Sequence, residues 1–152
     1  MKKIVIATNN LGKQKEIQAI LNNYECLTLK EVNCEVKIEE DQETFEGNAL
    51  KKASQIAKLK NLPCIADDSG LCIEALGGWP GVHTARFLGE EATQEQKNQA
   101  ILEKMKHLEG EERKANVECV VIYLEQGKYV IGKGEVQGRI AEKPRGERGF
   151  RI

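Results

Sequence analysis

The sequence has little net charge and no long hydrophobic run, and each of these features excludes some classes of protein. Its 23 Lys and Arg residues nearly balance its 24 Asp and Glu residues, so no global field would draw it to nucleic acid or to an anionic membrane. No segment approaches the ~18 apolar residues of a membrane-spanning helix. The apolar run near the start, Ile4 to Ala7, is shorter than the roughly 7–15 residues of a signal peptide. We therefore expect a cytoplasmic protein that binds neither nucleic acid nor membranes.

Cysteines at metal-binding spacing are also missing. The five cysteines are an odd number and include no C-x-x-C pair, which argues against a zinc site or a disulfide framework. Free thiols in a reducing compartment are the simpler interpretation. With 152 residues, of which 40% are hydrophobic and 31% charged, the chain has the length and composition of one globular domain with a buried core. We expect residues 1–152 to form that single domain.

Hydrophobic periodicity predicts strands and helices that alternate early in the chain and a hairpin late in it. The expected strands cover residues 3–7, 26–29 and 64–66, with a weaker one over 34–38. The expected helices cover residues 13–22, a long stretch that begins at the N-cap Thr44 and ends before Pro63, and 95–108. Residues 69–81 are expected to form a glycine-rich loop, and residues 116–124 and 128–136 a hairpin. This order is typical of a mixed-sheet α/β domain.

The stretch TNNLGK, residues 8–13, is typical of a site for an anion. A strand ends in a polar loop, and a helix then begins near Lys13, where free N–H groups and a partial positive charge accompany the ammonium group. Thr8, Asn9 and Asn10 can donate further hydrogen bonds. The stretch is not a P-loop, because the first glycine and the final hydroxyl residue of that motif are missing. A plain strand-to-helix turn with a solvated lysine is the alternative interpretation.

Two adjacent lysines in TFEGNALKKA are expected to point in different directions. Lys52 lies three residues after Ala49 and four before Ile56, so it borders the apolar face of the helix. It can reach into a cleft there, or its stem can simply cover apolar surface while its charge stays in water. Lys51 lies on the polar face and is the better candidate for simple solvation. Asn48 precedes Lys52 by four residues and is its neighbour on the helix surface.

Two adjacent carboxylates, Asp67 and Asp68, follow the short apolar strand in IADDSGL. Because they repel each other and are costly to bury, a cation is expected beside them. In an extended chain they would point to opposite faces, so that one could face a cleft while the other holds a loop. One of them together with a carboxylate from residues 39–41 would make a normal Mg²⁺ site. An Asx-turn that caps Ser69-Gly70 is the alternative interpretation.

Five stretches, in this order and spacing, resemble the inosine-triphosphate pyrophosphatase family: TNNLGKQKE, TFEGNALKKA, IADDSGLCIEAL, GGWPGVHTARF and PRGERGF. The resemblance covers essentially the whole chain. It implies a two-lobed α/β fold with a long mixed sheet and a cleft between the lobes, usually as a homodimer. It also implies Mg²⁺-dependent hydrolysis of non-standard purine nucleoside triphosphates (ITP, dITP and XTP) to the monophosphate and pyrophosphate, which clears them from the nucleotide pool.

The resemblance also implies roles for individual residues. Glu40 corresponds to the metal-binding glutamate of the family. Asp68 corresponds to a second metal ligand that also accepts a proton from the attacking water, which makes it the catalytic residue. Lys13 and Lys52 would then stabilise the charge that grows on the leaving pyrophosphate. The substrate-binding residues that the resemblance implies are Thr8, Asn9, Asn10, Gly12, Lys13, Lys52, Ser69 and, beside the base, Phe150.

Members of that family continue after the last motif with a Gly-Tyr-Asp-Pro segment, a strand, and a helix carrying Ser-His-Arg, which recognise the six-position oxygen of the purine. Here Gly149-Phe150 is followed by Arg151-Ile152. We therefore expect the usual C-terminal strand and helix to be missing, activity to be low and selectivity between ITP and GTP to be poor. Two other functions stay open: a catalytically impaired nucleotide-binding remnant, and a pyrophosphatase for pyrimidine or other modified nucleotides.

Overall fold

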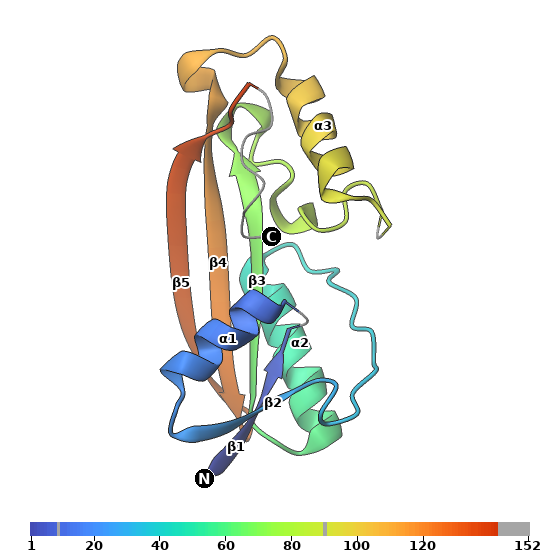
Figure 1. Ribbon diagram of the computed structural model, residues 1–152, viewed down its shortest axis with the longest axis vertical. Helices are drawn as coiled ribbons and strands as arrows, with labels where there is room; N and C mark the ends of the chain where they lie inside the picture. The colour runs from blue at the N-terminus through green and yellow to red at the C-terminus, as the bar shows by residue number, and fades with distance from the viewer. Residues whose placement is uncertain (9, 90, 143–152) are drawn as a thin grey trace. The chain divides into compact units, whose positions relative to one another are not determined.

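The computed structural model describes residues 1–8, 10–89 and 91–142, and its strands and helices alternate as the sequence predicts (Figure 1). The strands are β1 (Lys2–Ala7), β2 (Tyr24–Thr28), β3 (Cys64–Ile73), β4 (Lys114–Glu125) and β5 (Lys128–Arg139). The α-helices are α1 (Leu11–Ile20), α2 (Phe45–Lys60) and α3 (Gln94–Met105). Three short 3₁₀ helices are η1 (Glu74–Leu76), η2 (Gly81–His83) and η3 (Gly110–Arg113).

The strands form one mixed sheet in the order β2-β1-β3-β4-β5. β1 pairs in parallel with both β2 and β3. β4 and β5 are joined by Gln126 and Gly127, whose φ values of 50° and 79° suit the tight turn of an antiparallel hairpin. The predicted mixed-sheet α/β class is confirmed.

The chain divides into two compact units, as a two-lobed fold requires. Unit 1 contains Met1–Asp68 and Val120–Lys133, and unit 2 contains Ser69–Cys119 and the described residues from Gly134 onward. β3, β4 and β5 therefore contribute residues to both units. The boundary in β3 falls directly after Asp68, so the predicted phosphate and metal ligands with a described position, Ser69 excepted, belong to unit 1.

In unit 1 the helices lie on opposite faces of the parallel strands (Figure 1). The connection through α1 runs from β1 to β2 and the one through α2 returns past β1 to β3, and right-handed crossovers in opposite directions place the two helices on opposite faces. α2 buries Phe45, Ala49, Ala53 and Ile56, as its periodicity predicts. α1 has no buried residue, so its predicted apolar face is not part of the core. Thr44 caps α2 by accepting a hydrogen bond from the N–H of Gly47 at 2.9 Å, as predicted.

Unit 2 has its own core, in which Ile73 and Met105 are fully buried and Ile101 and Ala115 nearly so. The buried guanidinium of Arg113 holds together the segments at the edge of this core. It donates hydrogen bonds to the carbonyl oxygens of four residues, Met105, Leu108, Ile140 and Ala141, at 2.8–3.0 Å. One planar group therefore joins the end of α3 to the end of β5, a role that the five donors of arginine allow.

Two sequence-based expectations about the elements are wrong. Residues 34–38 form no strand, because Cys34 is buried but Val36 is 51% exposed, so the alternation has no sheet to pack against. Residues 69–81 are not one loop, since β3 continues to Ile73 and η1 and η2 follow. The expected strand ends before the two aspartates, whereas in the structure both aspartates have partners that allow β3 to run through them.

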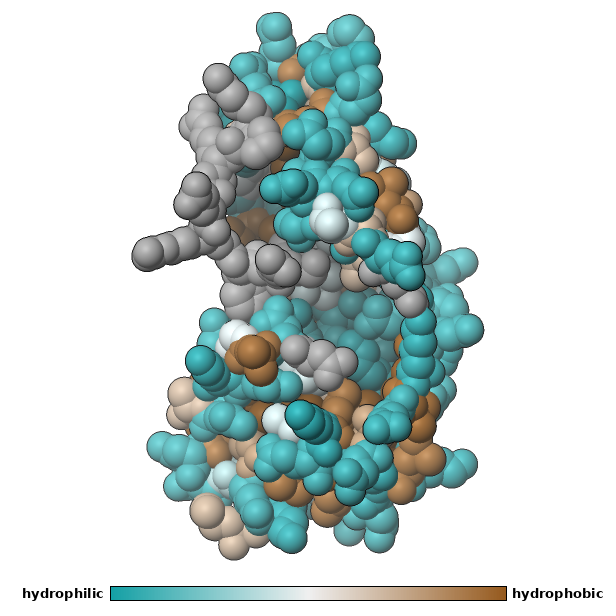
Figure 2. Space-filling model, turned by 45° about the vertical axis from the view of Figure 1, so that its right-hand side comes forward, coloured by the Kyte–Doolittle hydropathy of each residue, from teal (hydrophilic) through white to brown (hydrophobic). Residues whose placement is uncertain are grey.

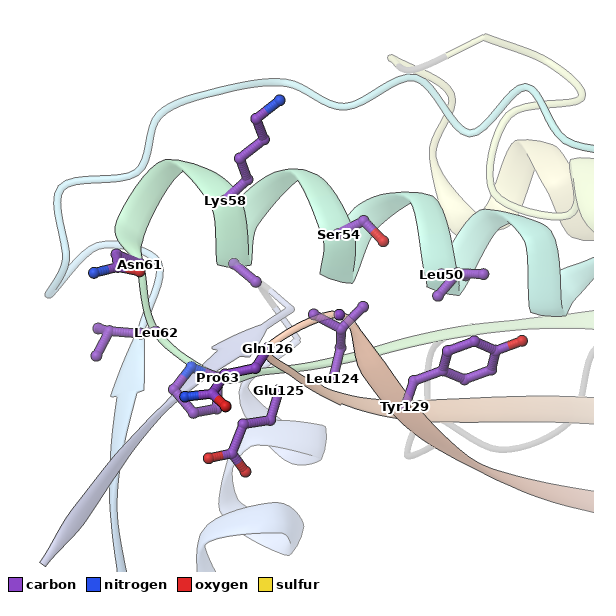
Figure 3. Close-up of a pocket in the computed structure, with 12 residues that line it drawn as sticks. Leu50, Ser54, Lys58, Asn61, Leu62, Pro63, Leu124, Glu125, Gln126 and Tyr129 are labelled. Atoms are coloured by element: carbon purple, nitrogen blue, oxygen red, sulfur yellow. The ribbon is translucent and has the colours of Figure 1, made fainter.

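A pocket of about 660 Å³ opens in unit 1 between α2 and the turn of the hairpin (Figure 3). Leu50, Ser54 and Lys58 line it from α2, and Leu124 and Tyr129 line it from the hairpin. None of the predicted site residues with a described position lines this pocket, so it is separate from the predicted phosphate and metal ligands.

The face drawn in Figure 2 is mostly hydrophilic, with hydrophobic residues scattered between. Within residues 1–8, 10–89 and 91–142, no helix combines the length and the hydrophobicity that crossing a lipid bilayer would demand. All five cysteines are free thiols, and Cys34 and Cys64 are buried.

Candidate active site

Asp67 and Asp68 are neighbours within β3, and their side chains point to opposite faces of the strand, as an extended chain requires. Asp67 faces α1, where the Nζ of Lys13 lies 2.5 Å from its Oδ2. Asp68 faces α2, where the Nδ2 of Asn48 donates a hydrogen bond to its Oδ2 at 3.1 Å. The cation predicted beside the aspartates is therefore confirmed for Asp67, and it is a lysine of the chain itself.

The environment of Asp68 raises the pKa of its carboxyl group. The residue is 9% exposed, and burial, followed by the charge of Glu40, raises the pKa of Asp68 from its ordinary 3.8 to about 6. The hydrogen bond from Asn48 and the charge of Lys52 act in the opposite direction but are weaker. A carboxyl group with a pKa near neutrality can release and take up a proton at physiological pH, which is what a general base needs.

Residues 40–42 form a strap along the start of α2, and three successive residues of the strap are each held by a residue of that helix. The Oε1 of Glu40 lies 2.9 Å from the Nζ of Lys52. The Oδ1 of Asp41 lies 2.7 Å from the Nζ of Lys51, so Lys51 is ion-paired and its expected simple solvation is wrong. The backbone N–H of Gln42 donates to the Oδ1 of Asn48 at 2.9 Å.

Lys52 connects the strap to β3. Besides Glu40, its ammonium group donates to the carbonyl oxygen of Asp67 at 2.9 Å, and its side chain is 18% exposed. The expectation that Lys52 borders the apolar face and reaches inward is confirmed, because its ammonium group contacts Glu40 and the backbone of Asp67; its role in binding phosphate stays a prediction. The simple snorkelling alternative does not apply.

The predicted anion-binding stretch leads into the N-terminus of α1, with an N-cap that the sequence did not predict. Asn10 is the N-cap, and its Oδ1 accepts a hydrogen bond from the N–H of Lys13 at 3.1 Å. The hydroxyl of Thr8 accepts one from the N–H of Asn10 at 3.1 Å. Gly12 lies in the first turn of the helix. The side-chain oxygen of Asn10 therefore holds the loop, and donation from its amide nitrogen to an anion stays a prediction.

Of the other predicted residues, Ser69 follows Asp68 in β3 and is half-buried. Asn9 and Phe150 lie outside the described residues. The sequence marks Asn48 only as a neighbour of Lys52, yet it contacts both the strap and Asp68. The signal that could have identified it is its position beside Ala49 on the buried face of the helix, since a buried amide needs hydrogen-bond partners.

The residues around Asp68 fit a magnesium ion. Glu40 and Asp68 are close enough for their charges to interact, and a divalent cation between two such carboxylates would offset both burial and repulsion. Mg²⁺ commonly takes one or two protein carboxylates and completes its shell with water and substrate phosphate. In the part of the chain that the structure describes, no group of three or more His, Cys, Asp or Glu side chains is arranged to hold a metal. The carboxylates of Glu40 and Asp68 are therefore the two groups here that could bind the ion.

Replacement of Asp68 by asparagine should stabilise the metal-free fold above pH 6. Well below its ordinary pKa of 3.8, the carboxyl group is protonated in both the folded and the unfolded chain, so it has no effect. As the pH rises toward 6, the unfolded chain releases the proton first, and the folded state loses stability. A rise in the pKa from 3.8 to about 6 corresponds to a loss of about 3 kcal/mol. The amide of asparagine stays neutral at every pH in this range. The variant therefore does not lose this stability as the pH rises.

Thermal unfolding with a metal chelator, measured from pH 4 to pH 8, checks this expectation. The gain should be smallest near pH 4 and complete above pH 6. Asp41→Asn is the matched control, because the hydrogen bond from Lys51 lowers the pKa of Asp41. Its charge stabilises the fold above its ordinary pKa, so that variant should lose stability at neutral pH. A variant of Asp68 that is less stable than the parent at pH 7 would contradict the proposed environment.

Comparisons with known proteins identify the family of the chain. The profile of the Ham1 family matches residues 4–151. The chain is 43% identical over 153 residues to the dITP/XTP pyrophosphatase of Geobacter sulfurreducens and 45% identical over 155 residues to that of Bacillus subtilis. Each alignment covers 99% of this chain and 77% of the relative.

Solved structures agree in fold. A HAM1 protein from Coxiella burnetii superposes with a TM-score of 0.89 at 37% identity, over 99% of this chain and 78% of that one. The Ham1 protein of Staphylococcus aureus gives a TM-score of 0.88 at 37% identity, over 98% of this chain and 77% of that one. The resemblance seen in the motifs is thus confirmed along nearly the whole sequence, and the chain belongs to the Ham1 family.

Proposed function

We propose that this protein hydrolyses non-standard purine nucleoside triphosphates, ITP, dITP and XTP, to the nucleoside monophosphate and pyrophosphate. The observation that carries the proposal is Asp68, a buried carboxyl group with a pKa of about 6 in the same unit as two lysines that could bind phosphate. The names of the relatives, dITP/XTP pyrophosphatases, support the choice of substrate.

In the proposed reaction, the oxygen of a water molecule bonds to the α-phosphorus and the bond from that phosphorus to the oxygen bridging to the β-phosphate breaks. Asp68 accepts a proton from the water, and the released oxygen leaves as part of pyrophosphate. Lys13 and Lys52 supply positive charge to the phosphates, and the N-terminus of α1 supplies N–H groups. Since Lys13 is paired with Asp67, a bound triphosphate would compete with that carboxylate for its ammonium group.

We propose Glu40 and Asp68 as the residues that would hold Mg²⁺. When bound, the ion would offset negative charge on the triphosphate and on the water to be deprotonated. We also propose a homodimer that acts in the cytoplasm, where nucleotide pools are found and where five free thiols suit the reducing environment.

The test is pyrophosphate release from ITP, XTP, dUTP and GTP with Mg²⁺ by this chain. Release from ITP and XTP and little from dUTP is the expected result, together with the poor selectivity between ITP and GTP expected from the sequence. Preference for dUTP would favour the alternative of a pyrophosphatase for pyrimidine nucleotides. Binding of Mg²⁺ and triphosphate with no release from any of the four would favour the nucleotide-binding remnant.

A further inference from the structure

Asn48 is the one residue of α2 whose side chain contacts both the strap and Asp68 among the hydrogen bonds of the described residues. It is 1% exposed and lies in the first turn of the helix. Its Oδ1 accepts from the N–H of Gln42 at 2.9 Å, and its Nδ2 donates to the Oδ2 of Asp68 at 3.1 Å. A polar side chain this deeply buried is costly unless its hydrogen bonds are made, and here they are made to two segments that are distant in the sequence.

The two hydrogen-bond partners determine the orientation of the Asn48 amide. A backbone N–H can only donate and an ionised carboxylate can only accept, so the oxygen must face Gln42 and the nitrogen must face Asp68. Asparagine carries a donor nitrogen and an acceptor oxygen side by side on one short, planar group, and glutamine is one methylene too long for the same site. The amide of asparagine therefore matches both partners at once.

The strap also packs closely against the start of α2. A Cβ at Gly47 would lie 2.9 Å from the Cβ of Gln42 and 3.0 Å from the Oγ1 of Thr44, so the glycine permits this approach. Glu40 is two residues from Gln42. Because the backbone of Gln42 is held by a buried group on the helix, the range of positions open to the Glu40 carboxylate is restricted before any ligand binds.

We propose that Asn48 is a positioning residue that fixes the Glu40 and Asp68 carboxylates relative to each other for a divalent cation. One amide holds the strap that carries Glu40 and orients the carboxylate of Asp68. The inference rests on the proposed function in one respect, that these two carboxylates are the metal ligands. Lys52 also contacts Glu40, but it does so with a flexible stem and a point charge, which constrain geometry less than a buried amide does.

The experiment measures Mn²⁺ binding, by the electron paramagnetic resonance signal of free Mn²⁺, in the full chain without nucleotide. Asn48→Leu keeps the branched shape of the side chain and removes both hydrogen bonds. We expect it to weaken Mn²⁺ binding by ~10–100-fold, the range found for partners that orient metal ligands, and to speed hydrogen exchange at the Gln42 amide. Lys51→Ala is the matched control, because it frees the same strap at an exposed ion pair; a loss below about fivefold is expected.

Equal Mn²⁺ affinity in Asn48→Leu and the parent would overturn the inference, even if the variant were less stable, because a purely structural role would change stability alone. If Asn48→Leu does not fold, Asn48→Ser serves instead, since one short hydroxyl group cannot reach both partners. A parent chain that binds no Mn²⁺ would overturn the metal site and this inference with it. A parent that binds Mn²⁺ but releases no pyrophosphate would refute the proposed function and leave the inference standing.

Discussion

Asp68→Asn is expected to lower pyrophosphate release by at least ~10²-fold while leaving the fold intact. The amide has the same size and can still accept the hydrogen bond from Asn48, so the packing around it is preserved. It cannot accept a proton at neutral pH, and it lacks the charge that a metal ligand supplies. General acid–base catalysis alone contributes ~10²–10⁴-fold, so the loss should be large.

The measurement is the steady-state rate with ITP and saturating Mg²⁺, together with circular dichroism to confirm folding. A folded variant that works at the parent rate would show that Asp68 is not the base. Asp41→Asn, which removes a carboxylate from the strap, is the control and should retain most of the activity. A combined result of higher stability above pH 6 and lost turnover in Asp68→Asn would be characteristic of a functional carboxyl group held at a cost to the fold.

Lys52→Ala and Lys13→Ala should each lower kcat/KM for ITP by ~10²-fold or more. Removal of one group that stabilises developing charge in a desolvated site typically has an effect of ~10²–10³-fold. Lys52 has a second effect, because its charge favours the ionised form of Asp68, and its loss would leave Glu40 and Asp68 without that cation. Lys13→Ala removes the partner of Asp67 as well as the proposed phosphate contact.

Lys51→Ala is the control for both variants. It removes a lysine from the same helix, next in sequence to Lys52, but one that is paired with an exposed carboxylate, so we expect less than about a fivefold loss. The assay is initial rate against ITP concentration for all three variants. Equal losses from Lys51→Ala and Lys52→Ala would mean that position on the helix face does not separate the two lysines.

Much of the fold could be predicted from the sequence because its periodic segments are packed as their patterns require. α2 is the clearest case, with Thr44 as its cap and Ala49, Ala53 and Ile56 buried. The strand predicted over residues 34–38 does not form, because alternation of buried and exposed side chains does not by itself provide a neighbouring strand to pair with. The first turn of α1 lies outside the predicted helix because Asn10, a hydrogen-bond donor by its amide nitrogen, caps that turn with its side-chain oxygen.

The candidate site was predictable in its residue types and less so in its contacts. Two adjacent carboxylates predict a cation nearby. Because side chains alternate along an extended chain, the two aspartates were expected to point to opposite faces. Lys13 as the partner of Asp67 could not be derived, because it depends on how α1 packs over β3. The roles of Asn48 and of Lys51 depend on the path of the strap, which has no periodic pattern to read.

The placement of Asp67 and Asp68 on opposite faces of β3 has a consequence for which changes in chain length the protein can tolerate. A substitution at either position alters one partnership, with α1 or with α2. Deletion or insertion of a single residue between Cys64 and Asp67 would exchange the two faces and alter both at once. A change of two residues would restore the faces but slide the pair by ~6.6 Å along the strand. This part of β3 should therefore vary in composition among working proteins while its length stays constant.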